Sequence, residues 1–286
     1  MSRVLCVVPT LWPPPLALDW AARSWLLDCD AVVFSISKGE LSSYAANSSL
    51  KVLIKPSRTV SILATHEKNE SKQPDVWVPV RAAIAYVAQH NMTRFDWLLL
   101  AEDDAFVVLS RLRQFLRLHS ASMPLFFGGC VCRRAPGINI FSRAALDHLL
   151  PHLPSCAPVQ TFADVNHRIS KVYGASDVSI MSCLNRAKLT CTRPLDADGH
   201  ALLSVWKYTK KGWLDALMHN ISKGHNFCSR DPCTIAEPDI TPPCFSSRAF
   251  GFHSRHLKSD GALREALQRE YAPLMMPAHR VRVQPS

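Results

Sequence analysis

Three consecutive acidic residues are the feature of this sequence best suited to chemistry. Glu102, Asp103 and Asp104 directly follow the apolar run at residues 97–101. Adjacent carboxylates repel one another and are costly to hold together unless a positive charge lies between them. A hard divalent cation that also binds a substrate phosphate would supply that charge. The triplet therefore predicts a metal site; the alternative is that it caps a helix beginning near Ala105.

The residues before the triplet predict where it lies in the fold. Residues 97–100 (WLLL) form a short run of large apolar side chains, which is typical of a buried strand. The carboxylates then stand where that strand leaves its sheet, and open α/β sheets bind ligands at this edge. The strand context favours the metal site over the helix cap.

The rest of the chain alternates strand and helix patterns. The β-α-β opening predicts an α/β fold with a mostly parallel central sheet flanked by helices. Residues 55–75 are polar and predict an exposed loop, and residues 195–199 predict a turn. We expect strands at 3–9, 31–36, 50–54, 97–100, 124–129, 138–141 and 250–253, and helices at 16–27, 75–89, 106–118, 142–150 and 176–188.

Composition limits the class of protein. The chain has 286 residues, of which 48% are hydrophobic, so it can bury a large core. Its formal net charge of +10 suits an anionic ligand, nucleic acid or an acidic membrane surface alike. Because no dense run of Lys and Arg with interleaved aromatics occurs, we do not expect nucleic acid as a partner.

Cysteines and sequons both indicate a secretory lumen. The ten cysteines include no CxxC pair, which argues against zinc and for disulfides. Candidate pairs are Cys6 with Cys29 and Cys156 with Cys183, although a free buried thiol is an alternative for Cys6. Four glycosylation sequons begin at Asn47, Asn69, Asn91 and Asn220.

The N-terminal residues show neither a clean signal peptide nor a run long enough to span a membrane. Three prolines at 13–15 break the one apolar candidate in residues 1–30. We therefore expect a membrane anchor outside this sequence.

Eight segments occur in a characteristic order along the chain: RVLCVV, the helix with Trp77, FDWLLLAEDDAFV, RLRQFL, PLFFGG, FSRAALDHL, SDVSIMSCL and FGFH. This order resembles the fringe-like β1,3-glycosyltransferases, most of all the core 1 β1,3-galactosyltransferase type. The resemblance runs from about residue 3 to about residue 256 and is weak in the loops. It implies a GT-A-like fold, a nucleotide-sugar donor and manganese.

The resemblance also implies roles for individual residues. Glu102, Asp103 and Asp104 match the acidic triplet where metal and UDP meet, with Asp104 as a direct Mn²⁺ ligand and Glu102 or Asp103 at the ribose or a metal-bound water. His253 matches the late histidine that completes the metal site, so the expected ligands are Asp104, Glu102 and His253. Asp177 matches the catalytic base; stabilising a helix N-terminus is its alternative role.

The implied reaction inverts the anomeric carbon. Asp177 would take the proton of the acceptor 3-hydroxyl as that oxygen attacks, while the metal neutralises the leaving diphosphate. No covalent enzyme intermediate is needed.

The sequence also departs from the family pattern. Glu102 replaces an aspartate, and residues 135–137 (APG) stand where relatives have Ser-Gly-Gly. Pro136 lacks a backbone donor, and Cys130 and Cys132 are extra cysteines. Two alternatives therefore stay open: a non-catalytic, chaperone-like lumenal homologue, and a β1,3-transferase that uses another UDP-sugar.

These observations predict a GT-A-like domain over residues 1–256 and a helical tail over 257–286. The expected partners are a UDP-sugar donor and a glycoprotein or glycan acceptor, with a homodimer as a further hypothesis. We expect residence in the Golgi lumen, with membrane association only through an N-terminal anchor absent from this chain.

Overall fold

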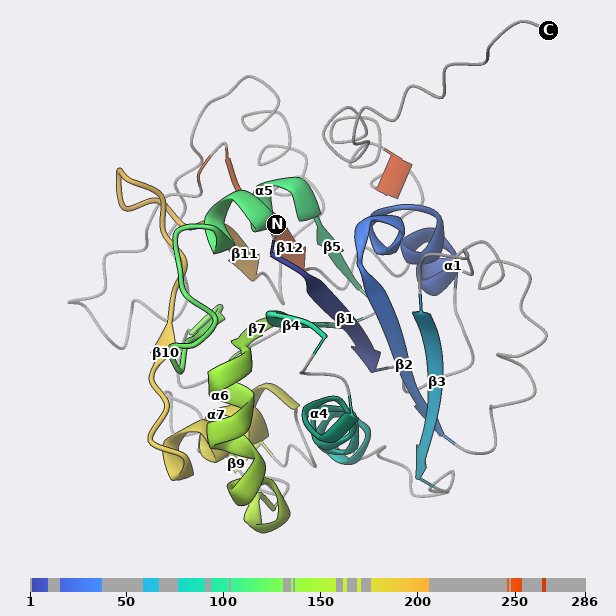
Figure 1. Cartoon of the computed structure of the whole chain (residues 1–286), viewed down its shortest axis with the longest axis vertical. Coiled ribbons are helices and arrows are strands. Elements are labelled where there is room, and N and C mark those ends of the chain that lie inside the picture. Colours follow the sequence, from blue (N-terminus) through green and yellow to red (C-terminus); the bar gives the residue numbers. More distant parts are fainter. Residues whose placement is uncertain are drawn as a thin grey trace, which may run out of the picture.

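The computed structural model describes residues 2–9, 16–37, 59–66, 77–90, 94–102, 104–130, 135, 137–157, 162–163, 169–170, 176–205, 246, 248–253 and 264–265. The structure is a mixed α/β fold built on a central sheet (Figure 1). The expected strand at 50–54 and nearly all of the expected tail lie outside the described residues.

The central sheet has seven strands in the order β10-β6-β7-β4-β1-β2-β3. Strand β7 runs antiparallel to both of its neighbours, whereas the other four neighbouring pairs are parallel. This confirms the expected mostly parallel sheet flanked by helices. The strands are β1 (Val4–Pro9), β2 (Ala31–Ser37), β3 (Thr59–His66), β4 (Trp97–Ala101), β6 (Phe126–Gly128), β7 (Ile138–Ser142) and β10 (Cys191–Thr192).

Helices cover both faces of this sheet (Figure 1). One hydrophobic core includes side chains of η1 and α5, such as Trp25 and Leu112. The other includes side chains of α4, α6 and α7, such as Trp77 and Leu184. Because both faces are covered, every residue of β1 and β4 is buried, as their continuous apolar runs predict. The helices are α1 (Leu16–Arg23), η1 (Trp25–Asp28), α4 (Trp77–His90), α5 (Leu109–Leu116), α6 (Arg143–Leu149), η3 (Leu150–Ser155) and α7 (Ser176–Arg186).

A small second sheet extends from the acidic triplet. Its three strands lie in the order β11-β12-β5, with bounds Leu203–Val205, Gly251–His253 and Ala105–Val107. Strand β12 is therefore the central strand of this sheet and is joined to β5 in antiparallel register. A third sheet consists of the short strands β8 (Phe162–Ala163) and β9 (Ile169–Ser170).

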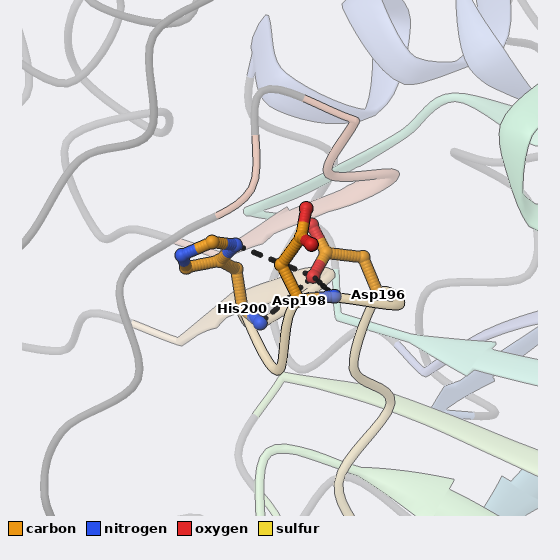
Figure 2. A group of neighbouring side chains, drawn as sticks. All are labelled: Asp196, Asp198 and His200. Carbon is orange, nitrogen blue, oxygen red and sulfur yellow. Dashed lines mark hydrogen bonds and ion pairs between the residues drawn. The ribbon is translucent and has the colours of Figure 1, made fainter.

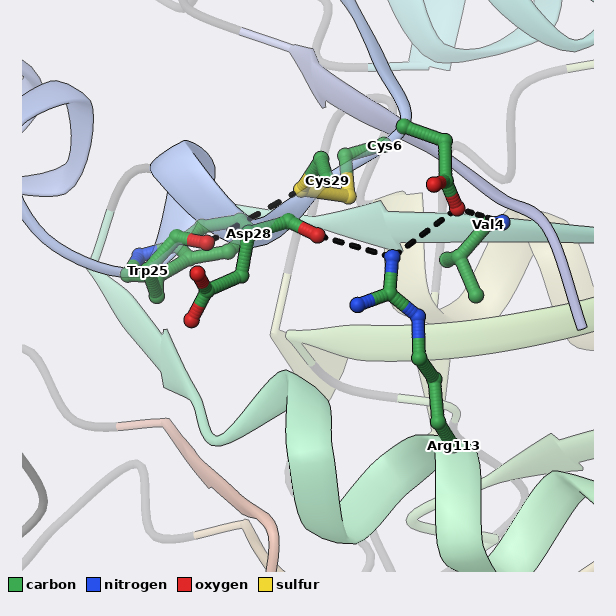
Figure 3. Close-up of a disulfide and its surroundings, with 7 residues drawn as sticks. Val4, Cys6, Trp25, Asp28, Cys29 and Arg113 are labelled. Carbon is green, nitrogen blue, oxygen red and sulfur yellow. Dashed lines mark hydrogen bonds and ion pairs between the residues drawn. A yellow bond between two sulfur atoms is a disulfide. The ribbon is translucent and has the colours of Figure 1, made fainter. Parts of the chain in front are cut away.

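A disulfide and a hydrogen bond join strand β1 to the segment between η1 and β2 (Figure 3). Cys6 is bonded to Cys29, which confirms that expected pair and excludes the free thiol at Cys6. Asp30 accepts from the Val4 N–H at 2.7 Å and from Arg113 Nη2 at 2.9 Å. The same guanidinium donates to the Asp28 carbonyl at 2.8 Å, so α5 is joined to the loop between η1 and β2.

Two further disulfides join distant segments. Cys156 is bonded to Cys183, as expected, and links the end of η3 to α7. Cys130 is bonded to Cys191 of β10, so one of the cysteines that the family resemblance left unexplained closes the edge of the central sheet. All six cysteines in the described part of the chain are thus paired.

Three local expectations were wrong. Residues 59–66 form β3 rather than an exposed loop, since Thr59, Val60 and Ile62 suit an edge strand. The helix expected from residue 106 begins at Leu109, because residues 105–107 pair with β12. The pattern of this helix predicts a basic, solvated face with Arg111, Arg113 and Arg117, but the Arg113 side chain is only 14% exposed and pairs with Asp30.

Candidate active site at the acidic turn

The two described residues of the acidic triplet, Glu102 and Asp104, lie in the connection between β4 and β5, which we call the acidic turn. It follows β4 directly, and the Ala105 N–H donates to the Glu102 carbonyl at 3.0 Å. Strand β5 begins at Ala105, so the triplet caps no helix there and that alternative is excluded. The chain adds β2 and β3 on one side of β1 and then β4 on the other. The turn therefore lies at the topological switch point, where open α/β sheets bind ligands.

The carboxylates of this turn differ in burial. Asp104 is only 3% exposed, whereas Glu102 is half-buried. Buried carboxylates are held by positive charge, by hydrogen bonds or by a metal ion. Asp103 lies outside the described residues.

Strand register brings the backbone of His253 to this turn. His253 in β12 pairs with Ala105 in β5, the residue directly after Asp104. Directly opposed residues of antiparallel strands have Cα atoms about 5 Å apart. The backbone positions of Asp104 and His253 are therefore close, although they are 149 positions apart in the sequence. The His253 side chain lies outside the described part of the structure.

Aromatic packing supports this register. Phe106 of β5 lies opposite Phe252 of β12, and their ring centroids are 6.4 Å apart. Trp20 of α1 stacks on Phe106 with centroids 5.3 Å apart. The Val108 N–H also donates to the Phe250 carbonyl at 2.7 Å, which extends the pairing beyond the strands. A shift of register would break these contacts and would move His253 away from Ala105.

Asp177 lies at the start of α7 and is 5% exposed. Its Oδ1 accepts from the Val178 N–H at 3.0 Å, as expected of an acid in the first turn of a helix. Its backbone carbonyl accepts from the Ala135 N–H at 3.1 Å. The Glu102 N–H in turn donates to the Gly137 carbonyl at 2.9 Å. Ala135 thus contacts the start of α7, and Gly137 contacts the acidic turn.

A second group of possible metal ligands lies in the turn at residues 195–199, which the sequence predicts correctly as a turn. Asp196, Asp198 and His200 each offer a ligand atom, and these atoms lie within 4.8 Å of one another (Figure 2). This acidic group could bind a metal. Asp196 Oδ1 already accepts from the N–H groups of Asp198 at 3.0 Å and His200 at 2.8 Å. The His200 Nδ1 lies 3.3 Å from the same oxygen.

The surroundings of Asp196 stabilise its charged form. Burial raises the pKa of Asp196, but a side-chain hydrogen bond with Ser246 and the two backbone hydrogen bonds lower it. The net result is a pKa below the ordinary value of an aspartate. The carboxylate therefore stays ionised without a metal, as in a self-contained turn.

Comparison with known proteins adds one partial similarity. No protein-family model matches the chain. Part of the chain is 29% identical over 91 residues to chondroitin sulfate synthase 3 of Homo sapiens, and the same holds for the Mus musculus protein. The similarity is to a glycosyltransferase. It covers 26% of this chain, and the chain spans only 10% of the length of these relatives.

Two parts of the site region were not recognised from sequence. The spacing Asp-x-Asp-x-His at 196–200 was a visible signal for the second group, but it was interpreted only as a turn. Asn139 in β7 gave no signal, because its hydrogen bond to the Ala135 carbonyl forms only in the folded chain. In the described part of the chain, no helix combines the length and the apolar content needed to cross a bilayer.

Proposed function

We propose that this protein is a metal-dependent, inverting glycosyltransferase that moves galactose from UDP-galactose in β1,3 linkage onto O-linked N-acetylgalactosamine of glycoproteins. The observation that carries the proposal is the acidic turn at the switch point, with the backbone of His253 opposite Ala105. The partial similarity to a glycosyltransferase supports the same reaction class. The donor, the linkage and the acceptor rest on the family resemblance of the sequence.

The proposed metal is Mn²⁺, with Asp104, Glu102 and His253 as ligands and Asp103 at the nucleotide. This donor set suits the ion, since Mn²⁺ prefers carboxylate oxygen and accepts imidazole. The burial of Asp104 and the register of β12 are compatible with such a site. When bound, the ion would act as a Lewis acid that neutralises the diphosphate leaving group.

The proposed general base is Asp177. A base must lie within hydrogen-bond reach of the acceptor hydroxyl, or one water away from it. Two observations support the assignment: Asp177 is buried at a helix start, and its backbone contacts Ala135 in a segment that also contacts Glu102. Taking the acceptor proton at this carboxylate would raise the nucleophilicity of the attacking oxygen.

The proposed location is the Golgi lumen. Three disulfides in the described part of the chain support an oxidising compartment, as do the sequons. A UDP-sugar and a glycoprotein or glycan acceptor are the proposed partners.

The first experiment measures Mn²⁺-dependent hydrolysis and transfer of UDP-galactose by the full chain. We expect Asp104→Asn to lower the activity by more than about 100-fold. Loss of a residue that only holds a metal ligand in place already lowers activity by about 10- to 100-fold, and loss of the ligand itself should lower it further. The matched control is Asp198→Asn in the second acidic group, which should keep the activity of the unmodified protein. If Asp198→Asn lost the activity and Asp104→Asn kept it, the metal site would lie at residues 196–200 instead.

The same assay separates the alternative functions. A chaperone-like homologue would show no Mn²⁺-dependent turnover with any UDP-sugar. A transferase with another donor would turn over UDP-N-acetylglucosamine or UDP-glucose in preference to UDP-galactose. Activity with UDP-galactose alone would support the proposal.

A further inference from the structure

Asn139 is a buried polar residue in the middle of the apolar core. It lies in β7 between Ile138 and Ile140 and is only 3% exposed. Its backbone pairs with Leu100 of β4 on one side and with Gly128 of β6 on the other. Asn139 is therefore close to the end of β4 from which the acidic turn emerges.

The Asn139 side chain holds the segment that precedes its own strand. Its Nδ2 donates to the Ala135 carbonyl at 3.1 Å. The Ala135 N–H donates to the Asp177 carbonyl at 3.1 Å, and the Gly137 carbonyl accepts from the Glu102 N–H at 2.9 Å. The Asn139 amide thus holds Ala135, which contacts Asp177 of α7 and lies two residues before Gly137, which contacts the acidic turn.

The oxygen of the Asn139 amide faces the neighbouring strand β6. Asn139 Oδ1 is buried and has no hydrogen-bond partner among the residues that the structure describes. It faces Gly128, where an added Cβ would lie 3.1 Å from Oδ1 and 3.2 Å from the Phe126 ring. An unmet buried acceptor is costly, so a requirement for stability alone does not explain an asparagine here.

We propose that Asn139 is a positioning residue, which sets the distance between Asp177 and the acidic turn by holding the Ala135 carbonyl. The inference rests on the proposed function of those two elements. Without the amide, the Ala135 carbonyl loses its hydrogen bond to Asn139. That hydrogen bond lies close to the contacts of Ala135 with Asp177 and of Gly137 with Glu102. A displacement of about 1 Å between reacting groups can lower a rate by about 100-fold.

The test compares two variants on the same strand. Asn139→Leu keeps the approximate side-chain volume and removes the amide. The control, Ser142→Ala, removes a buried hydroxyl that accepts from the Leu125 and Ala145 N–H groups, both at 3.0 Å. Ser142 pairs with Trp97 at the other end of β4, about 10 Å along the strand from Asn139.

The expected results separate positioning from folding. Asn139→Leu should lower kcat by about 10- to 100-fold with little change in the KM for the donor, whereas Ser142→Ala should keep kcat. Hydrogen exchange should accelerate at the amides of Ala135 and Glu102 in Asn139→Leu, and at those of Leu125 and Ala145 in Ser142→Ala. If Asn139→Leu does not fold, Asn139→Ala takes its place.

Two results would overturn the inference. One is a wild-type kcat in a folded Asn139 variant, and the other is unchanged exchange at Ala135 and Glu102. An unmodified protein without transferase activity would instead refute the proposed function. In that case the exchange rates of the Ala135 and Glu102 amides still show whether Asn139 holds the contacts with Asp177 and the acidic turn.

Discussion

Gly137 and Gly199 are the two glycines in the described residues with a positive φ, and they lie in the two candidate metal regions. Gly137 has a φ of 68°, and its carbonyl accepts from the Glu102 N–H. Gly199 has a φ of 80° in the exposed turn of the second group, with no neighbouring atom near the position of a Cβ. Both positions favour glycine for the same reason, because an L-residue there pays a steric cost.

Alanine substitutions at these two glycines separate strain from function. Gly137→Ala and Gly199→Ala should each lower the free energy of unfolding by about 1 kcal/mol, measured by urea denaturation. Only Gly137→Ala should also lower kcat, since its carbonyl contacts the acidic turn. A loss of activity in Gly199→Ala, with Gly137→Ala fully active, would argue for a site at residues 196–200.

At the scale of elements, the strands predicted from local pattern were found wherever the structure describes those residues, and strands that depend on distant partners were missed. The apolar runs of β1 and β4 indicate burial on both faces whatever their neighbours are. Strand β5 was assigned to a helix because its partner, β12, lies far along the chain. Strand β3 was missed because it lies at the edge of the sheet and its sequence mixes apolar with polar residues, as an exposed loop also does.

The candidate site shows the same division. The metal site at the acidic triplet was predicted from three adjacent residues and the strand before them. The structure confirms that strand, and the metal site stays a prediction. Asp177 and His253 were assigned through the family resemblance, and their roles remain proposals. Asn139 could not be predicted, since its contact with Ala135 depends on how a turn folds back onto β7.

The disulfide between Cys6 and Cys29 should stabilise the opening β-α-β unit without contributing to the site. Its cysteines are 23 residues apart, and cross-linking a loop of that size stabilises a protein by about 3 kcal/mol. The double substitution Cys6→Ala and Cys29→Ala should therefore lower the free energy of unfolding by about that amount and leave kcat unchanged at low temperature. A change below about 1 kcal/mol would show that the pairing of β1 with β2 and β4 is sufficient.

At the scale of the whole molecule, stability should depend on the protonation of His119. The ring lies beside Phe115 and Phe127, with centroids 4.6 Å and 4.8 Å away. Burial lowers the pKa of His119 below 6.5, so the folded state favours the neutral ring. As the pH falls below about 6.5, the His119 ring is protonated in the unfolded chain before it is protonated in the folded protein. The free energy of unfolding therefore decreases with decreasing pH.

Urea denaturation at a series of pH values measures this dependence. We expect the free energy of unfolding to decrease as the pH falls below 6.5, until His119 is also protonated in the folded state. His119→Phe should remove this part of the pH dependence, because the ring cannot be protonated. An unchanged pH profile in the variant would mean that another group causes the acid sensitivity.

The proposed function depends on a metal site that joins two segments far apart in sequence. The most direct measurement is pulsed electron paramagnetic resonance of bound Mn²⁺, which detects the nitrogen of a coordinated imidazole. We predict a nitrogen coupling that is lost in His253→Gln and retained in His200→Gln. A coupling that persists in His253→Gln and disappears in His200→Gln would contradict the acidic turn as the metal site.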